Sequence, residues 1–248
     1  MIDLDTVKLA VQLSRAAYGD SGTSAESQAQ ALGFEGITSV HFQDVNALVC
    51  RRDGRQWVAA SGTHFTENTS LSEIADNLQG DPIQIGGGAI VHSGYWGRAL
   101  RLYWYTRPLI EGPAVFCGHS LGGSTAHLMP YFFPKELAIE VVTCGAPKAA
   151  NDVFWKPLYK PGSWVREVRE KDFAPTWPES MADILPDSLT HLLNLHAVYT
   201  QPGPEAWLHN QTFNWIAARA GINDSVSDHN VDLYLSDTMN GKGFTADP

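Results

Sequence analysis

The chain alternates short apolar runs, which predict buried strands, with longer stretches that predict helices. We expect strands near residues 37–42, 47–52, 56–60, 114–117, 137–143 and 164–168, and helices near 95–109 and 121–129. Asp53-Gly54 supplies the turn of a hairpin between the second and third strands. Strands and helices that alternate along the middle of a chain are typical of a mostly parallel sheet. The pattern therefore predicts an α/β fold with an early antiparallel hairpin.

The segment from Pro113 to Gly123 joins one apolar run directly to the motif Gly118-x-Ser120-x-Gly122. A serine on the sharp turn between a parallel strand and a helix is held in strained geometry, with its hydroxyl exposed at the edge of the sheet. Side chains at the two flanking glycine positions would collide with the neighbouring strand and helix. The free N–H groups of the helix N-terminus also point at an oxyanion beside the serine. The segment predicts a nucleophile elbow, and hence a serine hydrolase.

Candidates for the other two members of a triad lie downstream, in the order Ser, Asp, His that this fold requires. Asp172 leaves the strand expected near 164–168 and enters a loop broken by proline. His229 lies in a polar segment near the C-terminal end of the chain. Order alone leaves rivals open for both roles. The rivals for the acid are Asp183 and Asp187, and those for the base are His191, His196 and His209.

Several segments together resemble the class 3 lipases, the α/β-hydrolases typified by fungal triacylglycerol lipases. The sequence Gly118-His-Ser-Leu-Gly-Gly123 matches the elbow of that family without change. Other similar segments are the expected opening helix at 9–18, Val91-His-Ser-Gly-Tyr95, Val142-Thr-Cys-Gly-Ala-Pro147, 168–175 and Asp228-His-Asn-Val-Asp-Leu-Tyr234. The resemblance runs from about Leu9 to Leu235. It implies an α/β-hydrolase with helices on both faces of the sheet, and it implies Asp172 and His229 over their rivals.

The resemblance also implies an oxyanion hole built from the backbone N–H groups of Thr63 and Leu121. The family usually carries Arg-Gly-Thr or Arg-Gly-Ser after an early strand, whereas this chain reads Ala60-Ser-Gly-Thr-His64. The arginine is missing, although Gly62-Thr63 remains. Whatever that arginine would anchor must therefore be held in another way. The Asp-Trp that commonly follows is also absent.

Residues 71–78 predict a short amphipathic helix. Ser70-Leu71-Ser72-Glu73 has the form of a capping box, and Leu71, Ile74 and Leu78 share one helical face. The resemblance places the lid of the family here. Two interpretations stay open, namely a lid that opens onto lipid and a fixed surface helix that packs its aliphatic side chains inward. The apolar stretches 173–185 and 204–220 could likewise line an acyl site or belong to ordinary packing.

Composition and charge fit one domain that spans residues 1–248. Hydrophobic residues make up 44% of the chain, and no linker or internal repeat divides it. The net charge of −10 and the lack of a basic run argue against nucleic acid as a partner. No stretch approaches the ~18 apolar residues of a membrane-spanning helix, so we expect no stable membrane insertion. The N-terminus lacks the features of a signal peptide, so we expect a protein that acts inside a cell or a secreted form that has lost its leader.

Other candidate chemistry is sparse. Cys50, Cys117 and Cys144 each lie in an apolar strand-like run, where a free thiol behaves as a small buried hydrophobe. No Cys-His spacing typical of zinc sites occurs, and the expected mechanism needs no metal or organic cofactor. We expect His92 and His127 to be structural, and we assign His119 no role in proton transfer.

Together these residues predict a serine carboxylic ester hydrolase, most simply a lipase that cleaves acylglycerol esters through a Ser-Asp-His triad and an acyl-enzyme. The expected partner is an acyl ester or lipid substrate, and contact with a lipid interface remains open. One alternative is a feruloyl-type esterase or phospholipase A1 on the same scaffold. Another is a catalytically inactive lipid-binding module, which the missing arginine suggests.

Overall fold

The computed structural model describes residues 2–19, 22–43, 45–63, 80–169, 172, 174–176, 205–207 and 229–240. Within these residues, seven strands form a central sheet in the spatial order β1-β2-β3-β6-β7-β8-β9. Their bounds are β1 Glu35–Phe42, β2 Val45–Arg52, β3 Arg55–Ala60, β6 Ala114–His119, β7 Ile139–Cys144, β8 Trp164–Val168 and β9 Glu205–Trp207. Strands β1 to β3 pair antiparallel, and every pairing from β3 to β9 is parallel. The predicted sheet, mostly parallel with an early antiparallel hairpin, is confirmed.

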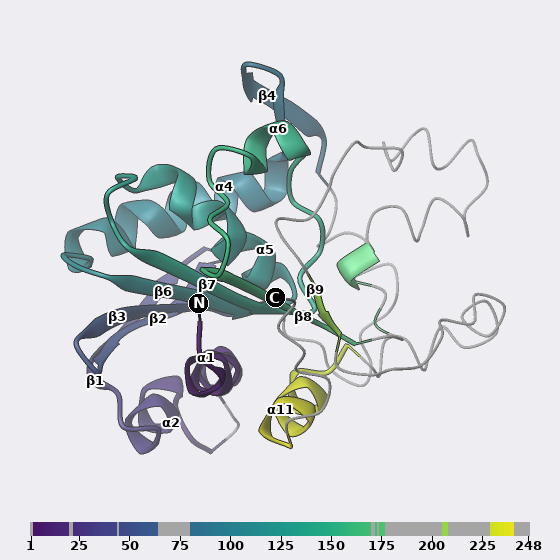
Figure 1. Ribbon diagram of the computed structural model, residues 1–248. Helices are drawn as coiled ribbons and strands as arrows, with labels where there is room; N and C mark the ends of the chain where they lie inside the picture. The colour runs from purple at the N-terminus through teal and green to yellow at the C-terminus, as the bar shows by residue number, and fades with distance from the viewer. Residues whose placement is uncertain are drawn as a thin grey trace, which may run out of the picture.

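Helices cover both faces of this sheet (Figure 1). In that view α1 (Leu4–Ala16), α2 (Ala25–Ala31) and α11 (Val231–Met239) lie below the sheet, and α4 (Ser93–Thr106), α5 (Leu121–Leu128) and α6 (Asp152–Trp155) lie above it. Helix α1 packs against β6 and α11, whereas α5 packs against β6 and β7. The α/β-hydrolase arrangement is therefore confirmed. In the described part of the chain, no helix is both long and apolar enough to cross a membrane.

The inner strands are buried on both faces, which explains their continuous apolar runs. Successive side chains of a strand point to opposite faces of a sheet. On β3, Trp57 and Ala59 belong to the hydrophobic cluster between the sheet and α1. Val58 and Ala60 belong to the cluster between the sheet and helices α4 and α5. Every residue of β6 is buried. The strand that carries the nucleophile elbow is therefore fixed from both sides.

Two helices differ from their expected bounds for local reasons. Helix α1 begins at Leu4, earlier than expected, because the Asp3 side chain caps it and accepts the Thr6 N–H at 2.7 Å. Helix α4 ends at Thr106 and continues as a 3-10 turn over Arg107–Leu109 that contains a proline. Further 3-10 turns lie at Met129–Phe132 and Ala174–Thr176.

The glycine cluster Gly86-Gly87-Gly88 forms the turn of a separate hairpin. This hairpin consists of β4 (Pro82–Gly86) and β5 (Ala89–His92). All three glycines have positive φ angles, between 57° and 117°, which residues with a side chain rarely adopt. The hairpin leads directly into α4.

The cysteines are free thiols inside the fold, on β2, β6 and β7. Burial raises the pKa of the Cys117 thiol to about 12, and it also raises the pKa values of Cys50 and Cys144. Because the thiolate is the reactive form of cysteine, these side chains behave as buried hydrophobes, as predicted.

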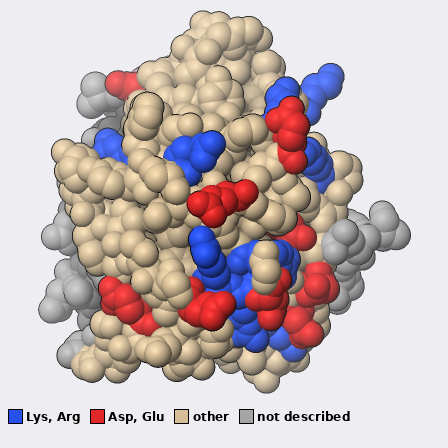
Figure 2. Space-filling model, turned by 90° about the vertical axis from the view of Figure 1, so that its left-hand side faces the viewer, with Lys and Arg blue, Asp and Glu red and all other residues tan. Residues whose placement is uncertain are grey.

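Charges of both signs mix on the face shown in Figure 2, which is the left-hand side of Figure 1. Among the side chains drawn in colour there, basic groups lie between acidic ones instead of forming one continuous basic patch. Ion pairs in the described residues include Arg55–Glu140 at 2.6 Å and Arg52–Asp53 at 3.3 Å.

Candidate active site

Ser120 occupies the turn between β6 and α5 in a strained conformation. Its φ of 58° and ψ of −131° lie in a region that residues with a side chain seldom populate, at a cost of about 1–3 kcal/mol. The Ser120 N–H donates to the carbonyl of Cys144 at the end of β7, at 3.0 Å. The expected strand, sharp turn and helix are all present, so the elbow geometry predicted from the motif is found.

The glycines around Ser120 permit very close backbone approach. A Cβ at Gly118 would lie 2.8 Å from the Gly123 nitrogen and would overlap the backbone of Gly122. A Cβ at Gly122 would overlap the Ala60 carbonyl at the end of β3. Real Cβ atoms do not approach backbone so closely, so both positions require glycine. The predicted collisions with the helix and the neighbouring strand are confirmed.

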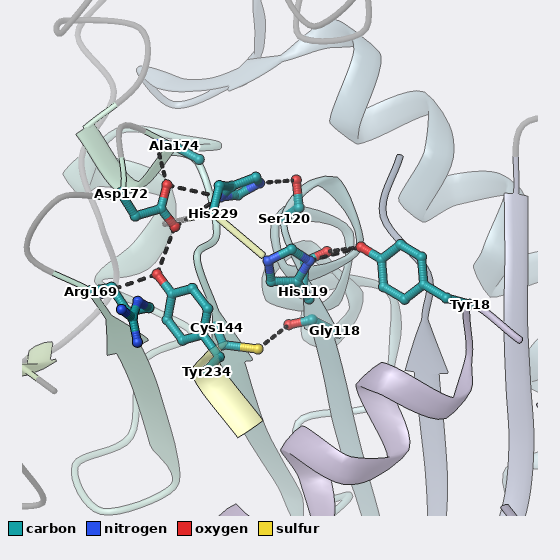
Figure 3. Close-up of polar contacts among 10 residues, drawn as sticks. All are labelled: Tyr18, Gly118, His119, Ser120, Cys144, Arg169, Asp172, Ala174, His229 and Tyr234. Carbon is teal, nitrogen blue, oxygen red and sulfur yellow. Dashed lines mark hydrogen bonds and ion pairs between the residues drawn. The ribbon is translucent and has the colours of Figure 1, made fainter. Parts of the chain in front are cut away.

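Three side chains that lie far apart in the sequence meet above the elbow (Figure 3). The Nε2 atom of His229 lies 2.7 Å from Ser120 Oγ, and its Nδ1 atom lies 2.8 Å from each carboxylate oxygen of Asp172. Asp172 follows β8, and His229 precedes α11. All three residues are buried. An imidazole between a hydroxyl and a carboxylate is the arrangement in which a histidine can remove the proton of a serine.

The Asp172 carboxylate is held by more than the imidazole. Tyr234, from α11, donates its hydroxyl to Asp172 Oδ2 at 2.6 Å, and the Ala174 N–H donates to Oδ1 at 2.8 Å. Arg169 N–H donates to the Tyr234 hydroxyl in turn, at 3.0 Å. Burial raises the pKa of Tyr234, and the Asp172 charge raises it further, so the phenol keeps the proton that it donates.

Gly145 leaves the space that this carboxylate occupies. Its φ is 58°, and a Cβ there would lie 2.8 Å from Asp172 Oδ2 and 3.2 Å from His229 Cε1. Gly145 and Tyr234 both lie in segments similar to the family, but the sequence alone indicated no role for either of them. For Gly145 the available signal was a glycine directly after a strand of the parallel sheet.

The ring of His119 lies beside His229, with the ring centres 4.7 Å apart. Its Nδ1 atom is 2.8 Å from the Tyr18 hydroxyl. Burial lowers the pKa of His119 far below its usual value, and the charge of His229 lowers it further, so this ring stays neutral at neutral pH. A neutral ring that faces a tyrosine has no evident part in moving the serine proton.

The two other histidines that we expected to be structural make local contacts. His92 precedes α4, where its Nδ1 accepts the Tyr95 N–H at 3.4 Å and its ring stacks on that of Tyr95. His127, on α5, has Nε2 at 2.8 Å from the Thr143 hydroxyl and stacks on Trp164. Both lie within the packing of the fold.

The proposed oxyanion donors flank the elbow. Leu121 is the first residue of α5, so its N–H has no acceptor within that helix. On the other side, a Cβ at Gly62 would lie 2.6 Å from the His119 carbonyl and 3.0 Å from Ser120 Cβ. The segment that ends in Thr63 is thus packed against the serine. Arg98, from α4, donates to the Ser61 carbonyl at 3.1 Å, and no pattern in the sequence had pointed to this arginine.

Several predicted residues lie outside the described residues. These are Leu71, Ile74 and Leu78 of the expected lid, the rival acids Asp183 and Asp187, the rival bases His191, His196 and His209, and most of the apolar stretches 173–185 and 204–220. Within the part of the chain that is described, no group of three His, Cys, Asp or Glu side chains could hold a metal ion.

A second buried polar cluster fixes α11, the helix after His229, to the sheet. Thr238 donates its hydroxyl to Glu167 Oε2 at 2.7 Å, and Arg169 forms an ion pair with Asp237. Burial raises the pKa of Glu167 to about 8. The helix that carries Tyr234 therefore meets β8 through the Glu167 carboxyl, whose charge depends on pH.

Glu167→Gln should remove a pH-dependent loss of stability. Burial raises the pKa of Glu167 from 4.5 to about 8, so the folded protein keeps a proton that the unfolded chain releases. The stability that this group contributes is full below about pH 4.5 and is lost as the pH rises through 8, by at most ~1.4 kcal/mol per pH unit. The free energy of unfolding, measured with urea between about pH 5 and pH 8, should therefore rise in Glu167→Gln relative to the wild type as the pH rises. Two parallel stability curves would contradict this.

A family model described as lipase (class 3) matches residues 58–181, half of the chain. The chain belongs to the class 3 lipase family. The match includes the second half of β3, the elbow, β7, β8 and Asp172, and it ends before His229. Family and fold together support an ester hydrolase of the lipase type.

Solved structures similar to this chain include fungal lipases. The lipase of Rhizopus microsporus var. chinensis has a TM-score of 0.61 at 18% identity, covering 85% of this chain and 76% of that one. Lipase II of Rhizopus niveus has a TM-score of 0.57 at 20% identity, with coverages of 85% and 82%. A triacylglycerol lipase described as having a serine protease triad at its catalytic centre has 0.56 at 19%, with coverages of 84% and 80%. These likenesses establish the fold. A comparison with curated protein sequences finds no significant match.

Proposed function

We propose that this class 3 lipase, as a single domain over residues 1–248, hydrolyses acylglycerol or similar acyl esters through an acyl-enzyme on Ser120. The observation that carries the proposal is the continuous relay from Ser120 Oγ through His229 to Asp172, with contacts of 2.7 and 2.8 Å. The solved triacylglycerol lipase with a serine protease triad gives the proposal further support.

In the acylation step, Ser120 Oγ forms a bond to the ester carbonyl carbon while His229 Nε2 takes the hydroxyl proton. Asp172 keeps the Nδ1 proton in place and stabilises the imidazolium. The carbonyl oxygen becomes an oxyanion, which accepts the N–H groups of Thr63 and Leu121. As the tetrahedral intermediate collapses, the ester C–O bond breaks and His229 gives its proton to the leaving alcohol. Water then repeats the sequence on the acyl-enzyme and releases the carboxylic acid.

The relay favours an enzyme over the inactive lipid-binding module. A surface that only binds lipid has no need of a buried imidazole between a hydroxyl and a carboxylate. The strain at Ser120 points the same way, because strained residues persist mainly where the arrangement serves a reaction. The missing family arginine does not remove the backbone donors on which the oxyanion depends.

A series of nitrophenyl esters of increasing acyl length, with and without an emulsion, tests the proposed substrate class. We expect turnover to extend to medium and long acyl chains and to rise when an emulsion interface is present. Activity confined to short acyl chains, with no gain at the interface, would reject the lipase in favour of an esterase. Release of fatty acid from phosphatidylcholine in preference to triacylglycerol would instead indicate phospholipase A1.

A further inference from the structure

The Ser61–Gly62 peptide, which precedes the proposed oxyanion donor Thr63, is contacted at both ends by side chains, one from α4 and one from the segment that follows α1. Its carbonyl accepts a hydrogen bond from Arg98 Nη2, on α4, at 3.1 Å. At its other end, Gly62 lies directly against the hydroxyl of Tyr18, which follows α1, so that a Cβ at Gly62 would overlap that oxygen. Upstream, the Ser61 N–H donates to the Asn46 carbonyl at 2.9 Å. These three contacts together hold the backbone up to Gly62, the residue before the proposed donor Thr63.

The next step along the backbone is the least constrained one. Glycine has the widest choice of φ and ψ of any residue, and the two dihedrals of Gly62 decide where the Thr63 N–H points. Glycine cannot be replaced there, because a Cβ would overlap the Tyr18 hydroxyl and lie 2.6 Å from the His119 carbonyl. Once the peptide plane before Gly62 is fixed, only the φ and ψ angles of Gly62 can change the direction of the Thr63 N–H.

Both clamping side chains are well placed and chemically suited to this task. Arg98 is 5% exposed and faces the sheet from α4. Burial raises the pKa of Tyr18, so its phenol stays protonated and can donate to His119 Nδ1, 2.8 Å away, while the same oxygen packs against Gly62. Figure 3 shows Tyr18 beside His119, on the side of that ring away from Asp172. Tyr18 thereby links the oxyanion segment to the residue directly before Ser120.

We propose that Arg98 and Tyr18 are positioning residues that clamp the Ser61–Gly62 peptide and so aim the Thr63 N–H at the oxyanion. The proposal depends on the proposed function of Ser120 and Thr63. It also accounts for the arginine that is missing from the family motif. That arginine would stand where this chain has Ser61, and here the guanidinium of Arg98 reaches the same segment from α4. Neither side chain touches the substrate in this scheme.

The variants Arg98→Met and Tyr18→Phe test the two ends of the clamp. Loss of one oxyanion donor lowers turnover by ~10²–10³, so partial misalignment should lower kcat by about 10–100-fold with little change in KM. Rates are divided by the concentration of sites titrated to completion with a fluorophosphonate, which removes any misfolded fraction. Arg98→Lys should recover part of the loss. Arg55→Met, which removes the ion pair with Glu140 at the opposite end of β3, serves as the control.

A trifluoromethyl ketone gives a readout that a merely structural role would not move. Ser120 Oγ adds to its carbonyl carbon, the serine proton passes to His229, and the resulting hemiketal oxyanion sits where the ester oxyanion would. Fluorine NMR then measures the pKa of the hemiketal. We expect that pKa to rise by about 1–2 units in Arg98→Met and Tyr18→Phe, matching the loss in kcat, and to stay unchanged in Arg55→Met. The loss of activation free energy in the double variant should be smaller than the sum of the losses in the two single variants, because both side chains hold the same peptide.

Two outcomes separate failure of this proposal from failure of the proposed function. Folded, fully titratable Arg98→Met and Tyr18→Phe enzymes with wild-type kcat and hemiketal pKa would overturn the clamp alone. A wild type that forms neither the fluorophosphonate adduct nor the hemiketal would overturn the role of Ser120 itself. If Arg98→Met does not fold, Tyr18→Phe decides the question, since it changes no charge and removes a single hydroxyl.

Discussion

Replacing Ser120 by alanine should lower kcat for any ester substrate by up to ~10⁶-fold, leaving the fold intact. The change removes the one atom, Oγ, that lies 2.7 Å from His229 Nε2, so the histidine has nothing to activate. The alanine keeps the backbone of the elbow and fills most of the same space. Hydrolysis of a nitrophenyl ester measures the loss, and thermal unfolding followed by circular dichroism checks the fold.

Ser163→Ala is a suitable control for this substitution. Its hydroxyl donates to the Lys160 carbonyl at 2.7 Å, just before β8, outside the Ser120–His229–Asp172 relay. Its activity should stay within about two-fold of the wild type, as is usual for surface substitutions remote from a site. Turnover in Ser120→Ala comparable to that of Ser163→Ala would mean that another group is the nucleophile.

Asp172→Asn should lower kcat by about 10³–10⁴-fold. Both carboxylate oxygens lie 2.8 Å from His229 Nδ1, so an amide in their place can present an N–H to that atom and favour the wrong tautomer. It also removes the charge that stabilises the imidazolium. Stopped-flow or steady-state kinetics with one soluble ester measures this loss in kcat.

Three other aspartates give the controls for this prediction. Asp232 lies in the first turn of α11, is exposed and pairs with Arg15 at 2.6 Å, so Asp232→Asn should keep nearly full activity. Asp183→Asn and Asp187→Asn test the rival acids directly. A loss of three orders of magnitude in either of these, with Asp172→Asn still active, would move the acid role away from Asp172.

The local parts of this fold could be predicted from the sequence because neighbouring residues determine them. The strand, sharp turn and helix around Ser120 are encoded in Pro113 to Gly123, and Asp53-Gly54 determines the turn between β2 and β3. Helix α11 was missed because 231–235 is a short apolar run, and such runs do not distinguish a strand from a helix. Asn230, whose side chain accepts the Asp232 N–H, caps that helix.

The partners of the site residues depend on packing between distant segments. Order along the chain left Asp183 and Asp187 as rivals of Asp172 for the acid role, and the resemblance was what favoured Asp172 over them. The hydrogen bond from Tyr234 depends on how α11 docks against β8. Likewise, Arg98 reaches Ser61 only because α4 covers the end of β3. No local sequence pattern predicts such hydrogen-bonded pairs, since each side chain alone is compatible with ordinary burial.

The most direct test of the proposed relay is to map the residue that a fluorophosphonate modifies. After digestion of the labelled wild type, mass spectrometry should place the phosphonyl group on Ser120. The rate of labelling should fall steeply in His229→Ala and Asp172→Asn, because both disable activation of the hydroxyl. A label on any other residue, or ester hydrolysis by a protein that never takes up the label, would contradict the account.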